Sequence, residues 1–183
     1  MISNRSRVLL WSLLSFLFLF GLAPARGNGT AAGICDKAKP CELLSQSNAE
    51  RILGQSTRPA KDATQLKGDV RQCLCAYTGV TPDKETGQDC LLFFALEEKE
   101  TNPTPEQARQ VLVSTKEANE HDTQILDLDG IGDQAFVLSN DPGSHLLMAR
   151  KGSVIMRLQV KRAVGAKSLE EIKAFALKAF KQI

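Results

Sequence analysis

The N-terminal 25 residues most strongly constrain what this chain can fold into, because they have the pattern of a secretory signal peptide. Arg5 and Arg7 precede an apolar run over residues 8–20, and residues 23–25 (Ala-Pro-Ala) end the segment with small side chains. A positive segment, an apolar segment and a small-residue cleavage site are the three parts of such a signal. We therefore expect residues 1–25 to be removed. The rest of the chain should then fold in the periplasm or outside the cell, where disulfides form.

The same segment could instead remain attached as a membrane anchor. Its apolar run is shorter than the roughly 20 residues that a spanning helix usually needs, but clustered arginines favour an N-terminus held inside the cell. Residues 26–39 are small, polar and rich in Gly and Ala, and we expect a flexible linker there. In the anchored alternative this linker would tether the domain to the inner membrane. A lipid anchor is not expected, because the bulky Ile34 precedes the nearest cysteine, Cys35.

Residues 40–183 are long enough for a single domain with a sizeable core, and their charges are unevenly distributed. From Ser144 to Ile183 the chain has 9 Lys or Arg and 2 Asp or Glu. Such a segment could contact phosphates or an anionic membrane. Alternatively, its lysines could lie on the solvated face of a terminal helix, where cations also suit the helix dipole. No aromatic stacking platform is evident among these charges, so nucleic-acid binding is not predicted.

Local patterns predict three helices separated by groups of strands. Ser47–Glu50 has the form of a capping box and begins a short helix that stops at Gly54. A second helix opens at Thr104 and Pro105. Its apolar stripe comprises Ala108, Val111, Leu112 and Thr115. A second capping box, Ser168–Glu171, begins the closing helix.

Runs of alternating or continuous apolar residues predict the strands. The predicted strands are residues 70–77, 89–96, 124–128, 134–138, 145–149 and 153–160. Turn-forming residues 81–87 separate the first two strands, which favours an antiparallel hairpin. The order helix, strands, helix, strands, helix predicts an α+β fold, with an antiparallel sheet and helices packed on one of its faces. The repeated order also raises the hypothesis of a duplicated helix–strand–strand module.

The five cysteines are expected to form a disulfide framework in an exported protein. They are Cys35, Cys41, Cys73, Cys75 and Cys90. Cys73 and Cys75 share one face of a strand and are too close to bond each other easily. We expect one of them to bond Cys41 and the other to bond Cys35 or Cys90, and the spacing leaves the connectivity open. A Cys-x-Cys pair can also bind soft metals or exchange disulfides.

No catalytic, metal or cofactor site is predicted. The two histidines, His121 and His145, are expected to be ordinary surface or strand residues, and no hydrolase, zinc, phosphate-loop or dinucleotide motif occurs. Asp127–Asp133 lacks the ligand spacing of a calcium loop, so we expect a tight turn there. The polar segments Lys61–Gly68 and Thr81–Gly87 are expected to be solvated loops, or else the rim of a binding site.

Several short motifs resemble those of small bacterial exported domains of unknown function. They are Pro40–Ser45 with the helix that ends at Gly54, Cys75-Ala-Tyr77, Gly130–Ala135, Lys151–Ile155 and the Ala-rich closing helix from Ala174 to Ile183. The resemblance implies a PsbP-like α+β fold with an antiparallel sheet and a disulfide between Cys41 and Cys75. Many such proteins are lipoproteins, and this sequence departs from them because it lacks a suitable lipidation cysteine.

We therefore expect a non-enzymatic domain of the cell envelope that binds an unidentified ligand or protein partner. The alternative is a thiol-redox or metal-handling protein that uses Cys73 and Cys75. A hydrolase with an unrecognised site is a third hypothesis.

Overall fold

The computed structural model describes residues 33–121, 123–141, 143–164 and 167–183. The predicted signal peptide, residues 1–25, and the first part of the predicted linker lie outside the described residues. Within the described ranges, no helix is both long and apolar enough to cross a bilayer.

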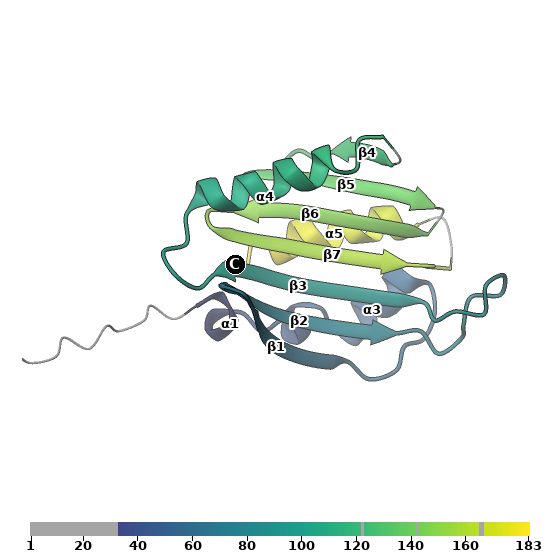
Figure 1. The fold of residues 1–183 in the computed structure, drawn as a ribbon. Coiled ribbons are helices and arrows are strands. Elements are labelled where there is room, and N and C mark those ends of the chain that lie inside the picture. Colours follow the sequence, from purple (N-terminus) through teal and green to yellow (C-terminus); the bar gives the residue numbers. More distant parts are fainter. Residues whose placement is uncertain (1–32, 122, 142, 165–166) are drawn as a thin grey trace, which may run out of the picture.

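The described strands form a seven-stranded antiparallel sheet in the order β1-β2-β3-β7-β6-β5-β4 (Figure 1). Their bounds are β1 Lys61–Lys67, β2 Val70–Thr78, β3 Leu91–Lys99, β4 Gln124–Asp127, β5 Gln134–Asp141, β6 Ser144–Lys151 and β7 Val154–Lys161. Two meanders, β1 to β3 and β4 to β7, meet where β3 pairs with β7. The predicted hairpin of β2 and β3 is confirmed, with Cys75 opposite Phe94.

The helices lie on both faces of this sheet. Their bounds are α1 Ile34–Lys37, α2 Pro40–Leu43, α3 Gln46–Leu53, α4 Pro105–Glu117 and α5 Ser168–Ala179. We call the face covered by α1, α2, α3 and α5 the back face. The face on which α4 packs, against β6 and β7, is the front face (Figure 1). An α+β fold is therefore present, but the expectation that the helices share one face is not confirmed, and a duplicated module is not evident.

Alternate residues of β6 belong to two different core clusters, one on each face of the sheet. Leu147 and Ala149 belong to the larger cluster, which includes residues of α5, whereas Met148 belongs to a smaller cluster with Ala108 and Leu112 of α4. Successive side chains of a strand point to opposite faces, so both faces of β6 are buried. The apolar stripe of α4 predicts that one side of the helix is buried, but it contains no information about which face of the sheet it covers.

Side-chain hydrogen bonds locate the starts of the first long helices. α3 is capped by Ser45, whose Oγ accepts from the Asn48 N–H at 3.4 Å, so the predicted cap at Ser47 is wrong by two residues. α3 ends at Gly54 as predicted, where the backbone φ is 70°. α4 begins at Pro105 as predicted, with Thr104 as its cap.

The closing helix begins differently from its prediction. Ser168 is the first residue of α5, and the preceding Lys167 makes no side-chain cap. The Ser168 hydroxyl is buried and lies 3.2 Å from Nε2 of His145 on β6. The predicted capping box is therefore wrong, because the serine side chain bonds across to the sheet.

Two segments that were predicted as a linker and as a loop contain regular secondary structure. Residues 33–39, the end of the predicted linker, include α1, and Ile34 and Ala38 are buried in the core. Residues 61–67, predicted as a polar loop, form the edge strand β1. Every residue of β1 is exposed, so its sequence lacks the apolar alternation by which buried strands are recognised.

Candidate functional site

The front face of the sheet is covered only in part. α4 lies over its β5, β6 and β7 side, and in the described part of the chain no helix covers the front of β1 and β2 (Figure 1). Burial follows this division. In β5, residues 135–138 are all buried, whereas β2 alternates between buried residues on the back and half-exposed residues such as Leu74 and Ala76 on the front.

Strand register defines the side chains of this uncovered surface. Four residues from four strands lie in one row across the sheet, because Ala63 pairs with Leu74, Leu74 with Ala95 and Ala95 with Arg157. The next row on the same face lies two residues further along each strand. We call this surface the open front face. It comprises Lys61, Ala63, Gln65, Lys67, Val70, Gln72, Leu74, Ala76, Thr78, Leu91, Phe93, Ala95, Glu97, Lys99, Arg157, Gln159 and Lys161.

The open front face is strongly basic. Its cations are Lys61, Lys67, Lys99, Arg157 and Lys161, and its single acid is Glu97. Lys99 pairs with Asp69 in the β1–β2 turn at 3.1 Å, and Arg157 pairs with Glu97. Within the described ranges, the other three lysines form no salt bridge. The surface therefore presents uncompensated positive charge around an apolar centre of Leu74, Ala76 and Phe93.

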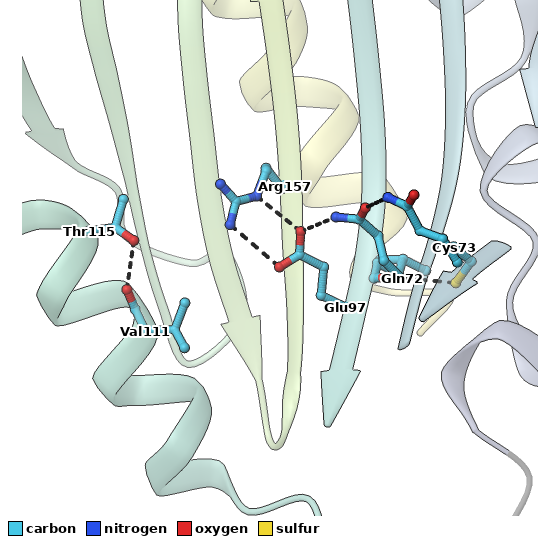
Figure 2. Close-up of polar contacts among 8 residues, drawn as sticks. Gln72, Cys73, Glu97, Val111, Thr115 and Arg157 are labelled. Atoms are coloured by element: carbon cyan, nitrogen blue, oxygen red, sulfur yellow. Dashed lines mark hydrogen bonds and ion pairs between the residues drawn. The ribbon is translucent and has the colours of Figure 1, made fainter. Parts of the chain in front are cut away.

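A chain of hydrogen bonds runs across the centre of this face, from β1 to β7 (Figure 2). Arg157 Nε donates to Glu97 Oε1 at 3.1 Å, and Arg157 Nη2 donates to Oε2 at 3.4 Å. The Gln72 amide also donates to Glu97 Oε1, and the Gln65 amide donates to Gln72. Only 10% of the Glu97 side chain is exposed, and the chain of donors stabilises its charge in this partly buried position.

Two adjoining hollows lie on or beside the open front face. The first, the basic hollow, has a volume of about 420 Å³. Its lining includes Lys67, Gln72, Phe93, Glu97 and Arg157. The second, the apolar hollow, has a volume of about 190 Å³ and lies between the sheet and α4. Its lining includes Ala108, Val111 and Ile155, together with polar residues such as Glu98, Lys99 and Gln107, and most of its accessible wall is apolar. Val70 and Glu97 line both hollows, so the two are neighbours.

The five cysteines lie away from the open front face. Cys35 pairs with Cys73 and Cys41 pairs with Cys75, with Cα–Cα distances of 5.5 and 5.1 Å, and Cys90 is a buried free thiol. The second pair is the one that the family resemblance implied. Together the two pairs hold α1 and α2 against the back face of β2.

The remaining candidates from the sequence are the two histidines and the segment from Asp127 to Asp133. The His145 ring bonds the Ser139 hydroxyl at 2.8 Å and the Ser168 hydroxyl at 3.2 Å, and burial lowers the pKa of the imidazole. His121 is exposed after the end of α4. Residues 128–133 connect β4 to β5. Asp127, at the end of β4, pairs with Lys116, and Asp133 pairs with Arg150. Among the described residues, no group of three His, Cys, Asp or Glu could hold a metal ion.

The predicted polar segments and the open front face overlap only in part. Lys61–Lys67 forms β1 and contributes one edge of the face. In the other segment, Thr81–Gly87, the Asp83 carboxylate accepts hydrogen bonds from the backbone N–H and the hydroxyl of Thr86 within the same loop. Sequence reasoning missed the pairing of Glu97 with Arg157. The available signal was Arg157 in the middle of β7, together with the acidic residues Glu97 and Glu98 that follow the apolar run of β3.

No protein-family model matches this sequence, and comparisons with curated proteins and with solved structures give no match either. The PsbP-like resemblance therefore stays a prediction. A proposal about function therefore rests on the open front face and not on similarity to a known protein.

Proposed function

We propose that the protein is a non-enzymatic domain exported to the cell envelope, where it binds a ligand or protein partner on its open front face. The observation that carries this proposal is the uncovered half of the sheet, which combines an apolar centre with five cations and one acid. Leu74, Ala76 and Phe93 are only partly buried there. An uncovered apolar patch with a charged border is typical of interaction surfaces.

The cysteine pairs support the exported location. Disulfides persist in oxidising compartments and are rare in the cytosol. Two pairs in one small domain, Cys35 with Cys73 and Cys41 with Cys75, are typical of a protein that folds outside the cytosol.

No observation favours the thiol-redox or metal-handling alternative. Cys73 and Cys75 are 2% and 0% exposed, and each bonds a cysteine of a different helix. A redox or metal-binding thiol needs an accessible thiolate. Neither side chain supplies one in the paired state.

Site-specific photo-crosslinking in cell envelopes tests the binding function. The photoreactive residue p-benzoylphenylalanine is placed at Gln65 or at Thr64, which are exposed neighbours on β1. Because strand side chains alternate, Gln65 lies on the open front face, where it lines the basic hollow, and Thr64 points to the other side. We expect a discrete adduct from the Gln65 variant and little from the Thr64 variant. No adduct at Gln65, or equal adducts at both, would contradict the proposal.

Intact-protein mass spectrometry tests the export step separately. We expect the exported chain to begin at Arg26, after the small residues of the cleavage site. A full-length chain that sediments with the inner membrane would contradict cleavage and support the anchored form.

A further inference from the structure

The two hollows differ in chemistry although they share lining residues. Lys67 and Arg157 give the basic hollow two cations against the single carboxylate of Glu97. In the apolar hollow, Ala108 and Val111 of α4 face Ile155 of β7. A ligand that fills both would need an anionic end and an apolar end.

Arg157 keeps hydrogen-bonding capacity beyond its pair with Glu97. Nε and Nη2 contact the carboxylate, and Figure 2 shows the third guanidinium nitrogen directed away from Glu97, toward the side of α4. A guanidinium carries five N–H donors in a fixed plane, so it can hold one carboxylate and still bind a second anion. Lys67 lines the same hollow and forms no salt bridge within the described ranges.

The apolar hollow accounts for an exposed residue in the stripe of α4. Ala108 and Leu112 are buried, whereas 39% of Val111 is exposed and its side chain lines the hollow. At about 190 Å³ the hollow is smaller than the roughly 300–1,000 Å³ of pockets for drug-sized ligands. Its size suits part of a narrow hydrocarbon chain better than a folded peptide.

We infer that the ligand of the open front face is a single-chain anionic amphiphile of the fatty-acid class. Its head group lies between Lys67 and Arg157, and its hydrocarbon chain lies between α4 and the sheet, against Val111. This inference rests on the proposed function and names the ligand class of the same site. Charge complementarity and the apolar hollow beside the cations are the observations that select this class.

Calorimetric titration of the exported, oxidised protein with three probes tests the ligand class. The probes are dodecanoate below its micelle concentration, dodecyltrimethylammonium with the same chain and the opposite charge, and acetate with the head group alone. We expect measurable binding of dodecanoate only. Equal binding of both twelve-carbon probes, or equal binding of dodecanoate and acetate, would overturn the inference.

Matched variants locate the binding. Lys67→Gln removes a cation that lines the basic hollow, and Lys61→Gln removes one on the same strand and face that lines neither hollow. We expect dodecanoate affinity to fall about 2- to 5-fold for Lys67→Gln, as for a partly exposed charge pair, and to stay unchanged for Lys61→Gln. Equal effects of the two variants would overturn the head-group position.

A second pair of variants tests the chain position. Val111→Gln introduces a polar side chain at the apolar hollow, whereas Leu177→Gln does so at an exposed position of α5, where 42% of the leucine is exposed. We expect a loss of about 5-fold for Val111→Gln and none for Leu177→Gln. Binding to phosphatidylglycerol vesicles that is unaffected by Val111→Gln would assign the face to a membrane surface and overturn the inference.

The two proposals fail in different ways. If dodecanoate does not bind but the Gln65 crosslink forms, the ligand class is wrong and the binding function stands. If neither occurs, both proposals are wrong.

Discussion

Glu97 and Arg157 are diagonal neighbours on β3 and β7, and their side chains form a two-point ion pair on the open front face, with N–O distances of 3.1 and 3.4 Å. Arg157 stands opposite Ala95, and Glu97 stands opposite Ile155, so the pair depends on the register of the two strands. Because only 10% of the Glu97 side chain is exposed, the guanidinium compensates a charge that water reaches poorly.

Arg157→Met should destabilise the fold, because it leaves the Glu97 carboxylate partly buried without its ion-pair partner. We expect a loss of about 1–3 kcal/mol in the free energy of unfolding, measured by urea denaturation. The double variant with Glu97→Gln should regain most of this loss, since the charge is removed as well. Lys161→Met is the control on the same face and should change stability by less than about 0.5 kcal/mol. Equal losses for Arg157→Met and Lys161→Met would contradict the structural role of the pair.

Thiol titration should find no reactive cysteine in the native protein. Cys90 is the free thiol, it is fully buried, and burial raises its pKa, which disfavours the reactive thiolate. After unfolding in urea without reductant, one thiol per chain should react, and after reduction all five should. Three reactive thiols in the unreduced, unfolded protein would show that one of the two pairs is absent.

Stability should decrease below pH 6.5 through His145. Burial lowers the pKa of its ring below the ordinary 6.5, and the Lys173 ammonium lowers it further. As the pH falls through 6.5, the unfolded chain binds a proton at this position before the folded protein does. The contribution of the neutral His145 ring to the free energy of unfolding is therefore fully present above pH 6.5. It is lost as the pH falls from 6.5 toward the lower pKa of the folded state.

Thermal unfolding of the parent and of His145→Gln at pH 7.5 and 5.5 measures this contribution. From pH 7.5 to pH 5.5, the Tm of the parent should decrease by more than the Tm of His145→Gln. His121→Gln, at an exposed position, should behave like the parent. An identical pH response of the parent and His145→Gln would count against this prediction.

The start of α3 provides a test of the cap. Ser45→Ala should cost about 1 kcal/mol, because the Asn48 N–H loses its acceptor. Ser47→Ala, two residues later on the exposed surface, should cost less than about 0.5 kcal/mol. Chemical denaturation of the two variants compares them directly, and a larger cost for Ser47→Ala would favour the cap that the sequence pattern suggested.

Elements with one buried side were the easiest to predict. The alternation of β2 and the stripe and cap of α4 are properties of neighbouring residues, so the sequence contains them directly. β1 carries no such pattern, because an edge strand that is exposed throughout is held by backbone pairing to β2 and not by burial.

The candidate site depends on relations that no local pattern contains. The open front face exists because α4 packs over one half of the sheet only, and no local pattern shows which strands the helix covers. The meeting of Glu97 with Arg157 requires the register of β3 against β7, two strands separated by most of the second meander. Val111 belongs to a predictable apolar stripe, but its exposure and its place in the wall of the hollow are visible only in the folded structure.

The covalent links on the back face have a mechanical consequence for a tethered form of the protein. Cys35 and Cys41, at the point where the chain enters the domain, are bonded to neighbouring positions of β2. A pulling force applied through the N-terminus would pass through the Cys35–Cys73 bond into β2, an inner strand of the sheet. The helices α1 and α2 could not separate from the sheet while the two disulfides remain intact. Load on a tethered domain would therefore reach β2 directly, the same strand that carries Leu74 and Ala76 of the open front face.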